Sequence, residues 1–121
     1  MTNTIQSRGR EFVGTVVNAK MQKTVTVEWP RQVYMPKFER YLTKRTRVKA
    51  HNPDSVGAKV GDMVRIQECR RISKTKSFLI IEKIGVNFQY VTKEEHLKAG
   101  VQARSEKPKE HPKIQKKEAA E

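Results

Sequence analysis

The spacing of apolar residues in the first 84 positions constrains the fold most, because it follows the repeat of a strand and forms no amphipathic helix. In residues 24–29, Val25, Val27 and Trp29 alternate with polar side chains, the period expected of a half-buried strand. Similar runs occupy residues 12–19, 43–50, the segment around Val64 and Ile66, and 77–84. Five strands joined by short turns predict a small all-β barrel, since a sandwich usually needs about seven.

Turn-forming residues indicate how these strands are connected. The turn Lys20–Lys23 joins the first two runs into a hairpin, and Pro30 is expected to end the second because proline has no N–H for the ladder. Residues 31–41 then form a long basic loop. Gly61 is expected to adopt a positive φ and Asp62 to cap the turn into the fourth strand.

The last strand and the C-terminal part have different compositions. Residues 77–84 are apolar enough to be buried on much of both faces, and Trp29 and Phe78 are expected in the core. Residues 92–103 predict a short helix, and from about residue 104 the composition favours a mobile tail. Periodicity favours a five-stranded OB-like barrel, although an SH3-like barrel would satisfy the same pattern.

The charge balance points to a polyanionic partner. The chain has a formal net charge of +13 and an isoelectric point of about 10.1. Residues 1–84 contain 18 Lys and Arg against 7 Asp and Glu, whereas residues 85–121 contain 8 against 6. Most of the net positive charge therefore belongs to the predicted barrel. Nucleic acid is the leading partner because each cation placed on a phosphate releases counterions. A membrane partner is not expected, since no apolar run approaches 18 residues.

Catalytic and metal-binding patterns are absent from the sequence. The three histidines are His51, His96 and His111, and no glycine-rich phosphate loop or carboxylate pair beside a nucleophile accompanies them. The single cysteine, Cys69, gives no zinc-ligand spacing. We therefore expect no enzyme activity, no metal, no cofactor and no small-molecule substrate. A general single-stranded nucleic-acid-binding OB protein remains the alternative function.

Several separated motifs resemble one family, and they occur in its order. They are Gly14-Thr15-Val16-Val17, Lys20-Met21-Gln22-Lys23-Thr24-Val25, Lys44-Arg45-Thr46, Ala50-His51-Asn52, Gly61-Asp62-Met63-Val64, Glu68-Cys69-Arg70 and Ser73-Lys74-Thr75-Lys76-Ser77-Phe78. Over about residues 10–84 the chain resembles the bacterial-type ribosomal small-subunit protein seventeen family. The resemblance implies an OB-fold barrel that binds small-subunit ribosomal RNA during assembly and has no catalytic role.

The resemblance also implies where the RNA would bind. The expected rRNA contacts are Lys20, Lys23, Lys37, Arg40, Lys44, Arg45, Arg47, Lys49, His51, Arg70, Arg71, Ser73, Lys74, Thr75 and Lys76. Plainer interpretations stay open. Lys20 and Lys23 could be solvated turn residues, and residues 43–49 could be an edge strand kept soluble by its charge. The hydroxyls of Ser73 and Thr75 could stabilise their turn through backbone hydrogen bonds. The aromatic side chains of the long basic loop are candidate base-stacking groups, namely Tyr34, Phe38 and Tyr41.

These expectations give a division into three parts: an N-terminal arm at residues 1–9, an rRNA-binding domain at 10–84 and a C-terminal extension at 85–121. Besides rRNA, neighbouring small-subunit ribosomal proteins are expected partners, reached through residues 85–121. The expected location is the ribosome. Because the extension is longer than bacterial members usually carry, the mitochondrial matrix is slightly favoured over the bacterial cytoplasm.

Overall fold

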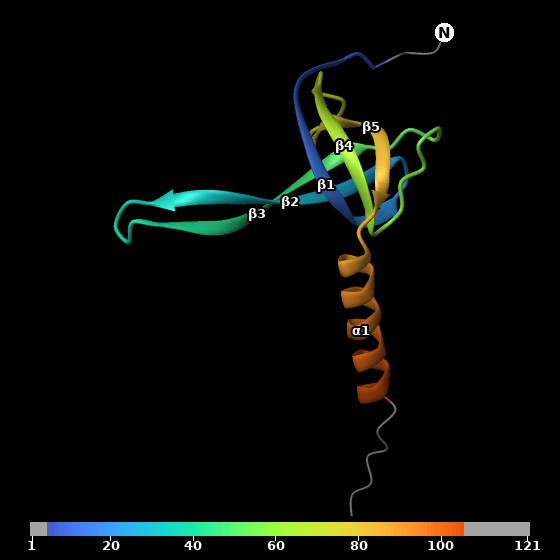
Figure 1. Cartoon of the computed structure of the whole chain (residues 1–121). Coiled ribbons are helices and arrows are strands. Elements are labelled where there is room, and N and C mark those ends of the chain that lie inside the picture. Colours follow the sequence, from blue (N-terminus) through green and yellow to red (C-terminus); the bar gives the residue numbers. More distant parts are fainter. Residues whose placement is uncertain (1–4, 106–121) are drawn as a thin grey trace, which may run out of the picture.

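The structure is a computed structural model that describes residues 5–105 of the 121-residue chain. Within these residues the chain forms five strands and one helix. They are β1 (Ser7–Met21), β2 (Thr24–Met35), β3 (Arg40–His51), β4 (Asp62–Cys69), β5 (Lys76–Val86) and α1 (Phe88–Ser105). The strands close into a barrel in the order β1-β2-β3-β5-β4 (Figure 1). The predicted five-stranded OB-like barrel is confirmed.

The barrel closes through one short parallel seam. All other neighbouring strands are antiparallel, whereas β3 and β5 run parallel and pair over Lys49↔Lys76, Ala50↔Phe78 and His51↔Leu79. A seam of three residue pairs has few ladder hydrogen bonds. Side chains that bridge β3 to neighbouring strands at this point therefore matter for closure.

Alternation along the strands builds a small aliphatic core. Its fully buried side chains are Val16, Val25, Val27, Val64, Ile66 and Ile80. The predicted core aromatics pack against one end of this cluster: the Trp29 ring stacks on Phe12 with centroids 4.9 Å apart, and Phe78 meets Phe12 edge-on at 6.2 Å. The inward and outward faces of β2 and β4 are thus those that the sequence predicts.

The loop predicted for residues 31–41 is wrong, because β2 runs through Pro30 to Met35 and pairs with β3 along its whole length. The two strands project from the barrel as a ribbon that ends in a turn at residues 36–39 (Figure 1). Pairing of β2 with β1 reaches only Glu28, so at Pro30 one edge of β2 faces no other strand of residues 5–105, and the missing N–H breaks no ladder there. We call residues 31–44 the hairpin arm.

The prediction that residues 77–84 are buried on both faces is also wrong. Ile80 is 2% exposed, but Ile81 is 39% and Ile84 is 49% exposed. A closed barrel encloses only one face of each strand. The two register shifts of β5 against β4 fall at Ile81 and Ile84, so these residues lie outside the enclosed face.

Helix α1 is longer than the predicted 92–103 segment and begins directly after β5. The Asn87 side chain caps it, because Oδ1 accepts a hydrogen bond from the Tyr90 amide at 3.2 Å. Gly61 has the predicted positive φ, at 91°, and a Cβ there would lie 2.6 Å from Val91 Cγ2, so the helix packs directly on this glycine. The predicted cap at Asp62 is confirmed, since Oδ2 accepts from the Lys59 amide at 2.8 Å.

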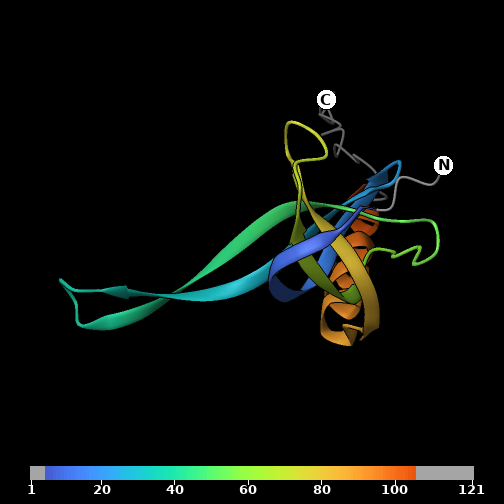
Figure 2. The same ribbon diagram turned by 90° about the horizontal axis from the view of Figure 1, so that it is seen from above.

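The hairpin arm projects to one side of the barrel and α1 projects below it (Figure 1), so in the view from above the arm extends away while α1 lies beneath the strands (Figure 2). The predicted mobile tail falls largely on residues 106–121, which lie outside the described residues, as do residues 1–4 of the expected N-terminal arm. Over residues 5–105, no helix is both long and apolar enough to cross a membrane.

Candidate nucleic-acid interface

Strand β3 presents a cationic outer face. Its burial pattern alternates, with Val48 half-buried and Ala50 fully buried between exposed basic residues. Arg45, Arg47 and Lys49 therefore share the outward face. Lys44 belongs to the opposite parity, so the four cations of residues 44–49 divide between two faces of the strand.

The hairpin arm carries basic and aromatic side chains far from the core. Lys37 lies in its terminal turn, with Nζ 5.6 Å from the centroid of the exposed Phe38 ring, and Arg40 begins the returning strand. Tyr34 and Tyr41 face each other across the ribbon with ring centroids 5.3 Å apart. The three candidate stacking rings are thus all solvent-exposed at the outer part of the arm.

Three of the predicted contacts, Lys23, His51 and Lys76, meet at the parallel seam. The Lys76 ammonium donates to Thr24 Oγ1 at 3.1 Å and to the Lys23 carbonyl at 3.4 Å, and it lies 3.3 Å from His51 Nδ1. Burial, followed by the charges of Lys76 and Lys23, lowers the pKa of His51 from its ordinary 6.5. A neutral His51 can accept from Lys76, so this cluster bridges β2, β3 and β5.

The turn before β2 is partly tied down as well. Lys23 adopts a left-handed φ of 50°, and its Nζ forms a 3.4 Å ion pair with the exposed Asp54 carboxylate. The Lys20 amide donates to Asn18 Oδ1 at 2.9 Å. The backbone of this turn is therefore ordered while both lysine side chains reach solvent.

The β4–β5 loop is a compact, hydrogen-bonded turn. Ser73 Oγ accepts from the Lys76 amide at 3.2 Å, and Arg71 Nη2 donates to the Lys74 carbonyl at 3.2 Å. The Ser73 hydroxyl thus has the turn-stabilising contact of the plainer interpretation. Arg70, Lys74 and Thr75 remain exposed at the loop surface. Burial raises the pKa of the Cys69 thiol at the end of β4, which disfavours the reactive thiolate.

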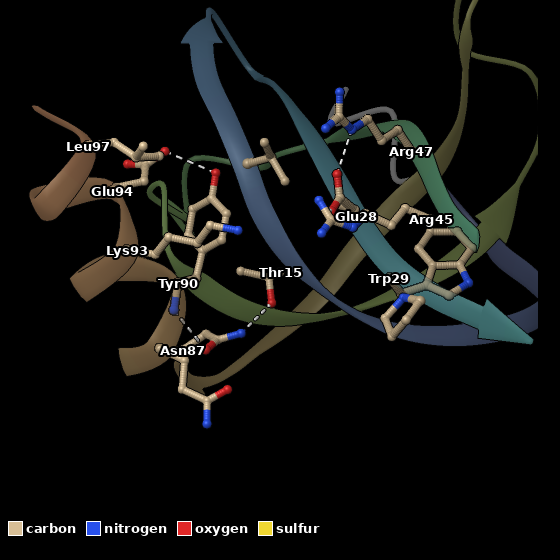
Figure 3. Close-up of a pocket in the computed structure, with 13 residues that line it drawn as sticks. Thr15, Glu28, Trp29, Arg45, Arg47, Asn87, Tyr90, Lys93, Glu94 and Leu97 are labelled. Atoms are coloured by element: carbon tan, nitrogen blue, oxygen red, sulfur yellow. Dashed lines mark hydrogen bonds and ion pairs between the residues drawn. The ribbon is translucent and has the colours of Figure 1, made fainter. Parts of the chain in front are cut away.

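A groove of about 550 Å³ separates the cationic face of β3 from the first half of α1 (Figure 3). Glu28 of β2 lies in it and is only 15% exposed. Its carboxylate accepts from Arg47 Nε and lies 3.7 Å from Arg45 Nη1, so one acidic group joins two arginines. Sequence reasoning missed Glu28 because its role depends on the β2–β3 register, in which Glu28 faces Arg47.

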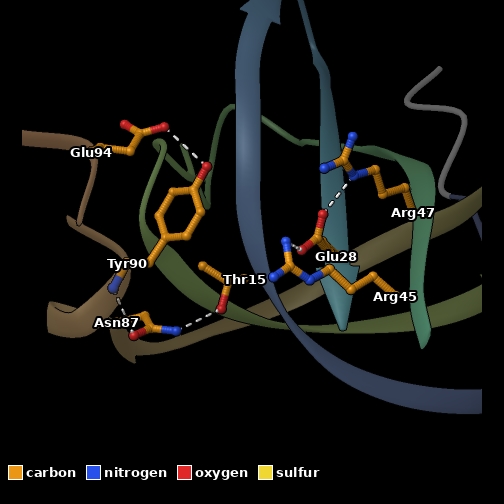
Figure 4. Close-up of polar contacts among 7 residues, drawn as sticks. All are labelled: Thr15, Glu28, Arg45, Arg47, Asn87, Tyr90 and Glu94. Atoms are coloured by element: carbon orange, nitrogen blue, oxygen red, sulfur yellow. Dashed lines mark hydrogen bonds and ion pairs between the residues drawn. The ribbon is translucent and has the colours of Figure 1, made fainter. Parts of the chain in front are cut away.

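The helical wall of the groove is held by a second set of hydrogen bonds (Figure 4). Asn87 Nδ2 donates to Thr15 Oγ1 at 3.0 Å, and Tyr90 Oη donates to Glu94 Oε1 at 2.9 Å. Burial, together with the Glu94 hydrogen bond, raises the pKa of Tyr90 to about 12, so this phenol stays neutral. Sequence reasoning also missed Asn87, although an asparagine directly before a helix is a recognisable cap signal.

The predicted site residues therefore gather in two places. Lys23, His51 and Lys76 meet at the seam, whereas the cations of β3 continue into the hairpin arm. Among residues 5–105, no three His, Cys, Asp or Glu side chains lie close enough together to hold a metal ion. The arrangement offers fixed cations and exposed rings, which are groups that contact phosphate and bases.

Comparison with known proteins identifies the family. The sequence model described as "Ribosomal protein S17" matches residues 14–82, which is more than half of the chain. The chain belongs to the ribosomal protein S17 family. The predicted family is therefore confirmed. The match begins within β1 and ends within β5, so it covers most of the barrel and the whole hairpin arm but stops before α1.

Archaeal members of the S17 family are similar to the chain. It is 50% identical over 78 residues to the small ribosomal subunit protein uS17 of Methanocaldococcus jannaschii, covering 64% of this chain and 67% of that protein. It is 49% identical over 82 residues to the protein of the same name from Archaeoglobus fulgidus, covering 68% and 73%. The protein of that name from Methanosphaera stadtmanae is 48% identical over 75 residues, covering 62% and 71%.

Proposed function

We propose that the protein is a structural constituent of the small ribosomal subunit that binds small-subunit rRNA through β3 and the hairpin arm. Membership in the S17 family supports this assignment, as do the relatives named small ribosomal subunit protein uS17. The observation that carries it is the continuity of positive charge. The outward face of β3 leads directly into a paired ribbon that projects from the barrel (Figure 1).

The mechanism is electrostatic and geometric. A closed barrel fixes the backbone positions from which the β3 lysine and arginine side chains project, and those side chains neutralise phosphates where two RNA segments approach each other. The arm reaches beyond the barrel, so barrel and tip touch separate parts of a folded RNA. Such a surface reads the shape of RNA helices and has few groups for reading base sequence.

The loops at the seam form a second, smaller contact surface in this proposal. Lys20, Arg70 and Lys74 have exposed side chains for phosphate, whereas His51 and Lys76 act mainly by holding β3 and β5 together. We therefore rank the seam residues below the β3 cations as RNA contacts. The division of the chain into an N-terminal arm, an rRNA-binding domain and a C-terminal extension, with boundaries after residues 9 and 84, stays a prediction.

A general single-stranded nucleic-acid binder is the second candidate. It would need exposed rings across the face of the barrel sheet. Phe12, Trp29 and Phe78 instead pack against the core, and the exposed rings of Tyr34 and Tyr41 lie on the arm. This distribution favours binding to structured RNA.

Further partners and the compartment follow from the same proposal. Neighbouring ribosomal proteins are candidate partners of α1, whose Leu97 and Val101 are exposed. The mitochondrial matrix stays a prediction that the archaeal relatives do not favour, so we propose the ribosome without choosing a compartment.

The test is binding of the full chain to a small-subunit rRNA transcript across a series of KCl concentrations, with poly(U) as competitor. Reversing three β3 charges, Lys44→Glu, Arg45→Glu and Arg47→Glu, should weaken binding about 100-fold and lower the salt slope by about two units. Each lost phosphate contact removes about 0.7–0.9 from that slope.

The matched control reverses the same number of charges elsewhere, at Lys59, Lys98 and Arg104. This triple variant should lose far less affinity because none of its residues belongs to the proposed surface. Equal losses in the two triple variants would show attraction by net charge alone. Equal affinity of the wild type for poly(U) and the transcript would favour the single-strand alternative.

A further inference from the structure

Glu28 is the acidic side chain most closely associated with the proposed RNA-binding surface. It faces Arg47 directly across the β2–β3 ladder and also pairs with Arg45, two residues along the same strand. The Glu28 side chain is 15% exposed, whereas the side chains of Arg47 and Arg45 are 62% and 64% exposed. The acid thus lies beneath two cations that remain open to solvent (Figure 4).

Both arginines keep donors for a further partner. A guanidinium group has five N–H donors in a planar fork. Arg47 uses Nε toward Glu28, and Arg45 approaches it through Nη1. The remaining N–H groups are free to donate to a phosphodiester, which accepts two parallel hydrogen bonds from arginine.

The groove surrounding these arginines has the size and chemistry for an RNA backbone. Lys93 of α1 adds a third cation to its lining, and the neutral Tyr90 side chain is fixed by Glu94. Glu94 also forms a 3.6 Å ion pair with Lys98. Both groove carboxylates are therefore engaged by the protein, which leaves the outward donors of the arginines for an anion.

We propose that Glu28 is a positioning residue that fixes Arg45 and Arg47 as a preformed fork for an RNA phosphodiester in this groove. The proposal rests on the proposed function and adds a specificity-determining acid to it. An arginine held in one orientation loses less conformational freedom on binding than a mobile one. Glu28 therefore strengthens binding to a polyanion although it carries a negative charge.

This proposal and simple electrostatics predict opposite signs. Removing a carboxylate raises the net positive charge, so attraction alone would make RNA binding tighter. If Glu28 positions the arginines, Glu28→Gln should instead weaken binding to the small-subunit rRNA transcript about fivefold to tenfold and lower the salt slope. Binding to poly(U) should change little, because a flexible strand gains less from a fixed fork.

Glu82 provides a matched control. It faces Arg65 across the β4–β5 ladder and pairs with it at 3.0 Å, so Glu82→Gln removes the same charge and breaks one cross-strand pair. Glu82 lies on β5, outside the hairpin arm, and it does not line the groove. Glu82→Gln should leave transcript binding unchanged or slightly tighter.

The experiment compares transcript affinity, salt slope and thermal unfolding for the full-length wild type, Glu28→Gln, Glu28→Asp and Glu82→Gln. The arginine Nε–Hε NMR signals report on positioning directly, and the Arg47 signal should move toward that of a solvent-exposed arginine in Glu28→Gln. Glu28→Asp keeps the charge with a shorter reach, so its affinity should be intermediate. If Glu28→Gln unfolds at the temperature of the binding assay, the affinity of Glu28→Asp tests the positioning role of Glu28 in its place.

Each outcome bears on one proposal. Equal affinities for the Glu28→Gln and Glu82→Gln variants, with a wild type that prefers the transcript, would overturn the positioning role and leave the proposed function intact. Tighter binding by Glu28→Gln would overturn it as well. A wild type without preference for the transcript over poly(U) would overturn the proposed function itself.

Discussion

Two elements project from the barrel, and they differ in charge. The hairpin arm contains four basic residues and one acidic residue, whereas α1 contains three basic residues and two acidic ones. The arm lies inside the family match and α1 lies beyond it. Projection from the barrel is therefore not sufficient to assign RNA binding, and the arm is assigned by its excess of cations.

The two projections also differ in how their backbones are stabilised. A helix satisfies its interior hydrogen bonds by itself, and α1 is additionally anchored at its first turn by Asn87 and Gly61. A two-stranded ribbon pairs only its inner edges and is marginally stable alone in water. A partner that contacts both strands of the arm would therefore stabilise the arm more than a comparable contact would stabilise α1.

Neutralising one Lys and one Arg on each projection tests the comparison with the largest expected effect. Lys37→Gln with Arg40→Gln on the arm should weaken binding to the rRNA transcript about 30-fold, or about 2 kcal/mol, because two phosphate contacts are lost. Lys98→Gln with Arg104→Gln on α1 should change it less than about twofold. Filter binding across a KCl series measures both affinities and slopes.

A similar loss in both double variants would contradict the distinction between the projections. A larger loss for the α1 variant would transfer the main RNA contact to the helix. In either case the salt slopes identify the cause, since only a direct phosphate contact lowers the slope by nearly one unit.

The sequence was informative wherever one face of a strand is buried. Alternation identified Val25, Val27, Val64 and Ile66 as inward-facing because burial follows the period of the pleat. The hairpin arm lies beyond the core and both its faces are largely exposed, so apolar spacing carries no signal there. The expectation that Pro30 ends β2 failed for the same reason, because β2 runs along the arm with a free edge.

Residue roles that depend on the register of strand pairing could not be predicted from the sequence. Glu28 has the appearance of an ordinary outward residue of β2, and only the β2–β3 alignment places it under two arginines. The family resemblance implied that Lys76 contacts RNA, but the parallel seam brings its ammonium to Thr24 and His51. Composition and the order of the motifs were sufficient to predict the family, because that prediction does not depend on how the strands pair.

Substitution of Gly61 tests the anchoring of α1 and has an intermediate expected effect. Gly61→Ala should lower the free energy of unfolding by about 1–2 kcal/mol, because alanine disfavours the φ of 91° and its Cβ would meet Val91 Cγ2 at 2.6 Å. Urea unfolding followed by far-UV circular dichroism measures this change, and helical signal should decrease before strand signal.

Gly100 is the matched control within α1. A Cβ at Gly100 meets nothing within 4 Å, so Gly100→Ala should stabilise the helix by about 0.5–1 kcal/mol. Opposite signs for the two Gly→Ala changes would establish that α1 is held at its first turn. Equal, small effects would mean that contact with Gly61 contributes little to the position of the helix.

The smallest expected effect concerns the C-terminal end of β3, opposite the hairpin arm, where His51 lies beside Lys76. Burial and the nearby Lys76 and Lys23 charges lower the pKa of His51 in the folded state below 6.5, and the Asp54 carboxylate opposes them. Well above pH 6.5 the ring is neutral in both states, and its contribution to stability is fully present. As the pH falls below that value the unfolded chain takes up the proton first, so this contribution is lost progressively until the lowered folded-state pKa is reached.

Replacing the ring isolates this effect. His51→Gln should flatten the acid side of the stability profile measured by urea unfolding between about pH 8 and pH 5, since glutamine does not titrate. Because the seam lies in the barrel, the slope that His51 contributes should appear in the strand signal and remain when Gly61→Ala has loosened α1. Parallel profiles for wild type and His51→Gln would show that the Lys76 contact does not depend on a neutral ring, and the seam would then be closed by the Thr24 hydroxyl and the Lys23 carbonyl.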